Sequence, residues 1–128
     1  MLESDHKKLI EYMQKFLVLC KKELMLDKLP TIQWLYGGEG SVNHRTFGTF
    51  NNKSQTIQIE IMNRHPVDIM RTLAHELVHY KQWTRGEINA KSGETGSKQE
   101  NQAHAVAGII MRHFDRTYPD AFNIKPVS

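Results

Sequence analysis

Residues 73–81 read LAHELVHYK and place two histidines, His75 and His79, inside an otherwise apolar and aromatic stretch. On an α-helix, side chains four residues apart lie on the same face, one turn above the other. The two imidazoles are therefore directed at one point. A separate apolar face of the same helix is formed by Ile69, Leu73, Leu77 and Tyr80. The stretch predicts a helix that packs against a core on one side and presents a histidine pair on another.

Glu76 completes a His-Glu-x-x-His pattern in this helix. Its side chain is turned by about 100° from that of His75, so it can approach an ion held by the histidines without having to ligate it. Two neutral imidazoles in this pattern bind Zn²⁺, and zinc lowers the pKa of a bound water toward about 7. The glutamate takes a proton from the water and delivers it to the leaving amine of a peptide. The alternative is a pair of surface histidines, which the apolar residues flanking both histidines disfavour.

A catalytic zinc site needs a third protein ligand, and Glu100 is the strongest candidate. It begins a helical face that continues through Ala103, His104, Ala107, Met111 and Phe114. The two alanines are small, so this face allows a second helix to approach closely. Glu100 also fits a capping box that starts at Ser97, and a carboxylate with two oxygens can serve both roles. His104 is the rival ligand, or a residue that orients a ligand.

The segments LAHELVHYKQ (73–82) and TGSKQENQAHAVAGIIMR (95–112) resemble the zincin superfamily in its glutamate-ligand branch, the gluzincins. They are most similar to small gluzincin-like and SprT-like metallopeptidase proteins of tailed phages, and more loosely to ImmA/IrrE-type peptidases. The resemblance covers about residues 55–116. It implies an active-site helix, a glutamate helix and an edge strand above the cleft. It also implies that His75, His79 and Glu100 bind zinc and that Glu76 is the base.

Two features depart from the family pattern. Many gluzincins have aspartate or asparagine four residues after the ligand glutamate, and this chain has His104 there. Residues 80–95 contain no third histidine of the kind found in SprT-like proteases.

The rest of the chain predicts an α+β fold, with a minimal zincin-like domain spanning residues 1–128. A helix is expected over about 5–27, with Cys20 on its apolar face. A strand is expected at 31–36, followed by a β-hairpin whose second arm, 55–62, alternates isoleucines with polar residues. Helices over about 63–83 and 98–116 complete a fold with a small three-stranded sheet that contains antiparallel pairing. Pro66 suits the first position of the first of these helices.

Contacts with a substrate are harder to assign from the sequence. The strand QTIQIEI (55–61) offers an exposed edge for an extended peptide, or is an ordinary strand. The glycine-containing loop 84–97 is a candidate lid or a slack connector. For the donor that stabilises an oxyanion, Tyr118, His113 and Tyr80 are available, and we select Tyr118.

Composition restricts the alternatives. The chain has 128 residues and a net charge of +3, and its isoelectric point is about 9.0, so a weak nucleic-acid contact through a basic surface is permitted. One cysteine excludes an intramolecular disulfide. The first residues do not read as a signal peptide and no apolar run spans a bilayer, which predicts a cytoplasmic protein without a membrane partner, in the host cytoplasm if phage-encoded.

The leading hypothesis is therefore a zinc metallopeptidase that acts on a peptide or protein. The alternatives are a non-catalytic zinc-binding module and a DNA-associated protein that uses the same fold as a scaffold. The oligomeric state is left open.

Overall fold

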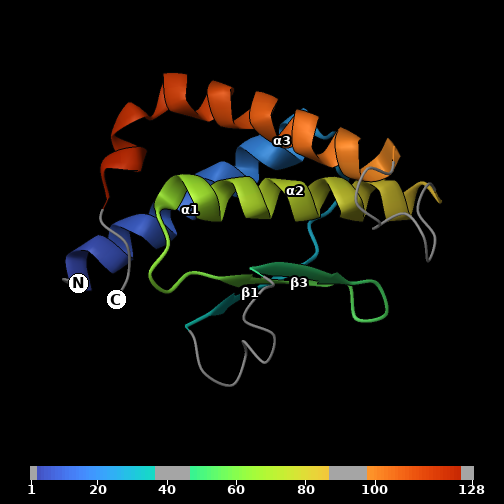
Figure 1. Cartoon of the computed structure of the whole chain (residues 1–128), viewed down its shortest axis with the longest axis horizontal. Coiled ribbons are helices and arrows are strands. Elements are labelled where there is room, and N and C mark those ends of the chain that lie inside the picture. The colour runs from blue at the N-terminus through green and yellow to red at the C-terminus, as the bar shows by residue number, and fades with distance from the viewer. Residues whose placement is uncertain (1–2, 37–46, 87–97, 125–128) are drawn as a thin grey trace.

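The computed structural model describes residues 3–36, 47–86 and 98–124. It consists of helices packed on one side of a small sheet, so the α+β prediction is confirmed (Figure 1). In chain order the elements are α1 (Glu3–Glu23), β1 (Thr31–Leu35), β2 (Gly48–Asn51), β3 (Thr56–Glu60), α2 (Pro66–Thr84), α3 (Lys98–Thr117) and a 3₁₀ helix, η2 (Pro119–Asn123).

The sheet is mixed, with strand order β1-β3-β2. β2 and β3 form the predicted hairpin and pair antiparallel, whereas β1 pairs with β3 in parallel. In β3, Ile57 and Ile59 are buried while Gln58 between them is partly exposed, as the alternation predicts. Because β3 is paired on both sides, the prediction that residues 55–61 offer a free edge is wrong, and the ordinary-strand alternative is correct.

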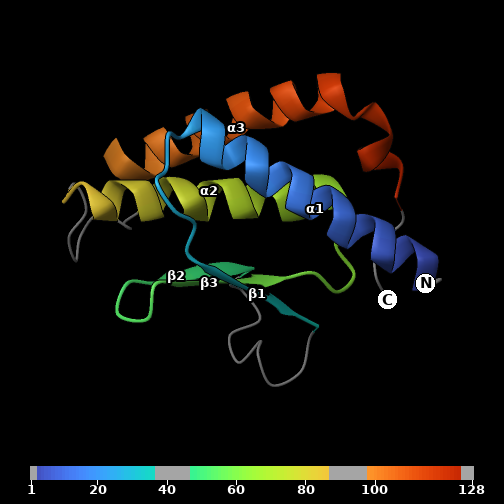
Figure 2. The same cartoon turned by 180° about the vertical axis from the view of Figure 1, so that it is seen from behind.

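α2 lies between the sheet and α3, and α1 crosses both helices (Figures 1 and 2). α2 and α3 run antiparallel along each other. Every layer contributes buried apolar side chains to one continuous core. Its largest fully buried members are Tyr80, Phe16, Phe114, Leu9, Met13, Ile57, Ile59, Ile61, Ile69, Met70, Leu73 and Leu77. The central place of α2 explains why its apolar face is so wide.

α2 begins where the sequence predicts, with Pro66 at the first helical position and Asp68 in the first turn. Its N-cap is His65, whose Nδ1 accepts a hydrogen bond from the backbone N–H of Val67 at 3.1 Å. This histidine is therefore structural. Arg64 secures the same corner by donating to the backbone oxygens of Glu60 and Asp68, at 2.9 and 3.1 Å.

Gly48 brings the edge strand β2 into direct contact with α2. A Cβ atom at this position would lie far inside the van der Waals distance of Thr72 Cγ2, and 3.4 Å from Glu76 Cγ. Since any side chain would push the two elements apart, glycine sets how closely β2 lies over α2. The strand consequently runs beside the glutamate of the His-Glu-x-x-His pattern.

α1 ends at Glu23, earlier than the predicted residue 27. The reversal occurs at Met25, which has a left-handed backbone with φ of 52°. Cys20 is fully buried on the apolar face, as predicted, and burial raises the pKa of its thiol. Of the helices that the structure describes, none has the length and apolar character needed to traverse a bilayer.

Candidate metal centre

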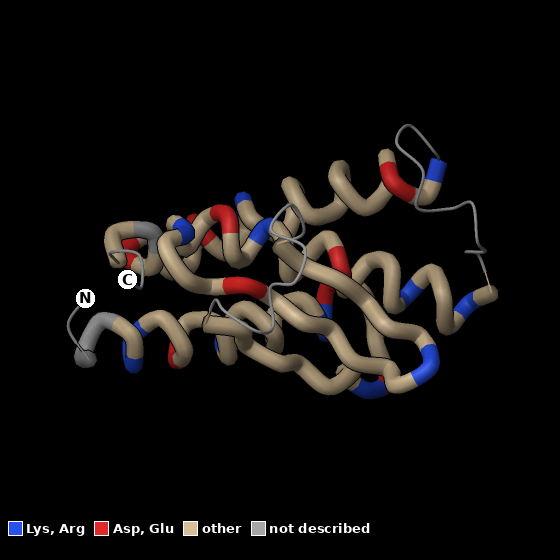
Figure 3. The backbone as a smooth tube through the Cα atoms, turned by 60° about the horizontal axis from the view of Figure 1, so that its bottom comes forward, with Lys and Arg blue, Asp and Glu red and all other residues tan. Residues whose placement is uncertain are grey.

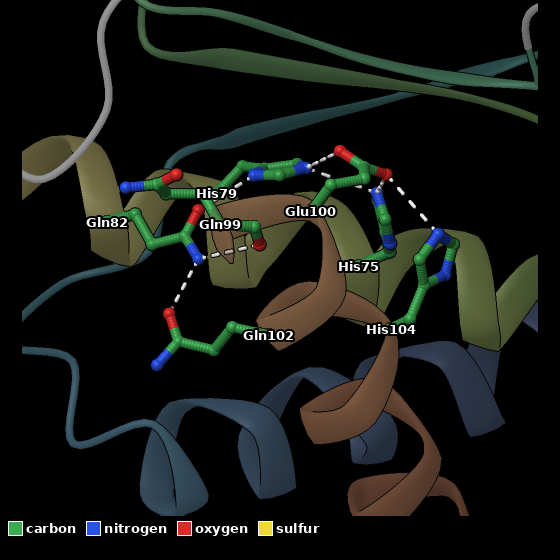
Figure 4. Close-up of polar contacts among 7 residues, drawn as sticks. All are labelled: His75, His79, Gln82, Gln99, Glu100, Gln102 and His104. Atoms are coloured by element: carbon green, nitrogen blue, oxygen red, sulfur yellow. Dashed lines mark hydrogen bonds and ion pairs between the residues drawn. The ribbon is translucent and has the colours of Figure 1, made fainter. Parts of the chain in front are cut away.

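Three side chains from α2 and α3 converge on one point (Figure 4). The Nε2 atoms of His75 and His79 are 3.1 Å apart. The carboxylate of Glu100 lies against both, with Oε1 2.7 Å from His75 Nε2 and Oε2 3.0 Å from His79 Nε2. The structure therefore brings together the three residues that the sequence predicts as ligands.

The convergence follows from the packing of the two helices. His75 and His79 are one turn apart on α2, and their rings meet edge to face with centroids 4.7 Å apart. On α3, Ala103 and Ala107 are fully buried, so this helix approaches α2 closely as their small size predicts. Glu100 stands in the first turn of α3, directly opposite the histidine pair.

The group has the chemistry of a metal site. One ligand atom from each of the three residues lies within 4.8 Å of the others. Imidazole nitrogen and carboxylate oxygen are ligands for divalent transition metals. Each side chain keeps between 13% and 19% of its surface exposed, so solvent reaches the group. Burial lowers the pKa of His75 against the raising influence of Glu100, which favours the neutral imidazole that binds metals.

Glu76 lies beside this group but on another face of α2. It is partly buried between the helix and β2, where Gly48 leaves room for its side chain. Burial raises the pKa of Glu76 to about 8, and the nearby carboxylate of Glu100 acts in the same direction. A group with this shift is protonated at neutral pH unless a cation lies close by.

His104 lies at the rim of the centre. Its Nε2 is 3.4 Å from Glu100 Oε1, and its ring centroid is 4.5 Å from that of His75 (Figure 4). The His104 side chain is 67% exposed, far more than the three converging side chains. His104 therefore adjoins Glu100 and does not replace it in the group.

Tyr118 is far from the centre, and its selection as the oxyanion donor is wrong. It follows the last residue of α3, 18 residues after Glu100, which corresponds to about 27 Å along a helix axis. There its ring packs against Tyr12 and Phe114, with centroids 6.0 and 5.0 Å away. The length of α3 therefore keeps Tyr118 away from the centre.

The two alternatives to Tyr118 have structural roles. His113 Nδ1 lies 2.7 Å from Glu23 Oε1 on α1, and Tyr80 is buried against Phe50. The predicted lid, 84–97, lies outside the described residues from residue 87 onward, as does Ser97 of the capping box.

Gln82 is the residue at this centre that the sequence analysis missed. It is only 2% exposed, and its Oε1 lies 2.8 Å from His79 Nδ1. Its amide nitrogen donates to the backbone oxygen of Gln99 at 3.0 Å and to Gln102 Oε1 at 2.7 Å. The available signal is its position, three residues after His79, which places it within reach of that histidine on the helix.

Basic residues are dispersed over the described part of the chain. Figure 3 shows Lys and Arg positions on α1, at the β2–β3 turn and toward the ends of α2 and α3, interspersed with Asp and Glu. The suggested weak nucleic-acid contact stays a prediction.

Comparisons of the chain with protein-family models, curated proteins and solved structures found no match. Functional inference therefore rests on the motif and on the geometry of the centre.

Proposed function

We propose that this protein is a zinc-dependent peptidase of the gluzincin type. The observation that carries the proposal is the convergence of His75, His79 and Glu100 from two helices, with Glu76 adjacent to His75 in the chain and within the electrostatic influence of the Glu100 carboxylate. Four-coordinate zinc with ligands at 2.0–2.1 Å separates its ligand atoms by about 3.3 Å. His75 Nε2 and His79 Nε2 are 3.1 Å apart, and one ligand atom from each of the three residues lies within 4.8 Å of the others, so modest movements of the side chains would accommodate the ion.

Two histidines and one carboxylate also match the ligand set of catalytic zinc, which keeps a fourth position for water. When bound, zinc supplies Lewis acidity, lowering the pKa of water toward about 7 and polarising the peptide carbonyl. The resemblance to gluzincins adds the expectation that this set belongs to a peptidase. A structural site needs no acid–base residue at its side, whereas Glu76 occupies that place.

Glu76 would serve as the general base. Its carboxylate accepts a proton from the attacking water and returns that proton to the amine leaving group. The raised pKa of about 8 suits proton return, and the charge of a bound cation counteracts the shift so that the ionised form is available. The side chain of Glu76 lies next to Gly48 of β2 through its Cγ atom, so the base stands close to the strand along which a substrate would lie.

Strand β2 would hold the peptide. It is paired with β3 on one side and stands at an edge of the sheet formed by the described residues. An extended peptide added along its other side would gain main-chain hydrogen bonds. Because β2 touches α2 at Thr72 and Glu76, this arrangement brings a scissile bond close to the base. The substrate edge is thus assigned to β2 and not to β3.

The test combines metal content with hydrolysis. Wild type and Glu76→Gln, each loaded with zinc, should contain about one zinc per chain by elemental analysis. Fluorescently labelled casein should be cleaved by the wild type only. Stoichiometric zinc in both proteins without cleavage of casein or of a random peptide library would favour the non-catalytic zinc-binding module. Absence of zinc from the wild type would refute the proposal altogether.

A further inference from the structure

We propose that Gln82 is a positioning residue of the metal centre, which sets the tautomer of His79 and ties the histidine helix to the glutamate helix. The inference rests on the proposed zinc site but concerns a residue outside its ligand set. Gln82 is buried on α2, and its amide group makes hydrogen bonds to one histidine and to two residues of α3.

The orientation of the Gln82 amide follows from its partners. A backbone carbonyl only accepts hydrogen bonds, so the Gln82 atom 3.0 Å from the Gln99 oxygen must be the amide nitrogen. The amide oxygen then faces His79 Nδ1 at 2.8 Å. Since that oxygen only accepts, Nδ1 of His79 carries the proton.

This tautomer leaves the lone pair of neutral His79 on Nε2. Nε2 is the atom that points at His75 Nε2 and at the carboxylate of Glu100, at 3.1 and 3.0 Å. In the neutral ring, Gln82 therefore directs the lone pair of His79 toward the place where the ion would bind. Hydrogen-bonded partners of this kind raise the basicity of a ligating histidine and hold its ring in place.

The amide nitrogen of Gln82 contacts the other helix, α3. Gln99 directly precedes Glu100, and Gln102 follows two residues later. By donating to both, Gln82 fastens the first turn of α3 against α2 at the level of the ligand carboxylate (Figure 4). One buried side chain thus controls both the tautomer of one ligand and the placement of another.

Three variants separate these two actions. Gln82→Met keeps a similar volume and removes every hydrogen bond of the side chain. Gln82→Glu keeps an acceptor toward His79 and loses the donors toward α3. Gln102→Ala, at an exposed position, removes one α3 partner and leaves the His79 contact intact. Folding of each variant is checked by far-UV circular dichroism and by dispersion of the amide NMR spectrum.

The first measurement is the ¹⁵N chemical shifts of the His79 ring in the metal-free protein, at an alkaline pH where imidazole is neutral. Wild type, Gln82→Glu and Gln102→Ala should carry the proton on Nδ1. Gln82→Met should show a mixture or the Nε2 tautomer. A merely structural role in the fold would leave the tautomer unchanged.

The second measurement is zinc affinity by competition with a chromophoric chelator. Gln82→Met should bind zinc about 10–100-fold more weakly than the wild type, the usual effect of removing a partner of a ligating histidine. Gln82→Glu and Gln102→Ala should lose less zinc affinity than Gln82→Met. A wild-type proton on Nε2 of His79, or a zinc Kd in Gln82→Met within about twofold of the wild type, would overturn the inference. Zinc binding absent from the wild type would instead refute the proposed function.

Discussion

The replacement Gly48→Ala tests the close contact between β2 and α2. The backbone of Gly48 is not in the left-handed region: among the described glycines, only Gly86 has a positive φ. Alanine can therefore adopt its conformation, and the cost arises from packing. The new methyl group would overlap Thr72 Cγ2 and lie 3.2 Å from Ile59 Cδ1. The isoleucine atom is the flexible end of a side chain and can move.

Thr72 cannot move as easily. Its hydroxyl donates to the Asp68 backbone oxygen at 2.8 Å and accepts from Arg64 at 2.7 Å. Rotating the side chain would break both bonds, at about 0.5–1.5 kcal/mol each. Lifting β2 away instead carries the usual cost of overpacking, about 1–3 kcal/mol. Breaking two hydrogen bonds would cost about 1–3 kcal/mol, the same range as overpacking. Gly48→Ala should therefore lower the free energy of unfolding by about 2 kcal/mol.

The assay is urea unfolding followed by tryptophan fluorescence. With a slope of about 1–3 kcal/mol/M, the midpoint should fall by roughly 1 M. The matched control is Thr72→Ser, which removes the overlapping methyl group and keeps the hydroxyl; alone it should cost no more than about 1 kcal/mol. In the double variant the serine should recover at least half of the Gly48→Ala loss. A loss under about 0.5 kcal/mol, or strictly additive effects, would refute the proposed contact.

Three further predictions concern the centre and its surroundings. The pKa of Glu76 is raised from 4.5 to about 8, so its contribution to the stability of the metal-free protein is complete below about pH 4.5 and is lost as pH rises through about 8. Above pH 8 Glu76→Gln should be more stable than the wild type by the order of a few kcal/mol, with a much smaller difference near pH 4; equal pH dependence in urea titrations would contradict this. Zinc at about 100 times its Kd should stabilise the wild type by about 2.7 kcal/mol in thermal unfolding, and Glu100→Ala should lose most of this increment together with its bound zinc; an unchanged increment would remove Glu100 from the ligand set. His113→Ala, which breaks a surface pair with Glu23, should change stability by less than about 1 kcal/mol and leave zinc affinity unaltered; weaker zinc binding there would mean that affinity reports folding in general.

Local patterns predicted much of the centre. The spacing of His75 and His79 places them on one helical face wherever that helix packs, because the period of the α-helix is a property of the backbone. The small residues Ala103 and Ala107 likewise mark the face of α3 that can approach another helix, and Glu100 continues that face. The hairpin is equally local, since its strands are joined by a short polar turn.

Two features of the centre depend on distances that the local sequence does not give. The chemistry of Tyr118 suits an oxyanion donor, but most of the 20-residue helix α3 lies between it and Glu100. Nothing in the local sequence singles out Gln82, since a glutamine near the end of a helix is usually exposed. Its burial depends on α3 covering it.

The sequence by itself determined the helices, the hairpin and the presence of three candidate ligands on two faces, since each depends on neighbours within a few turns of chain. Only the tertiary structure decided that β3 occupies the middle of the sheet, that β2 lies over Glu76, and that Gln82 joins the two helices. Strand order and buried hydrogen bonds depend on which segments, far apart in the sequence, come into contact. An alternating strand pattern or a lone polar residue is compatible with several different contacts of this kind.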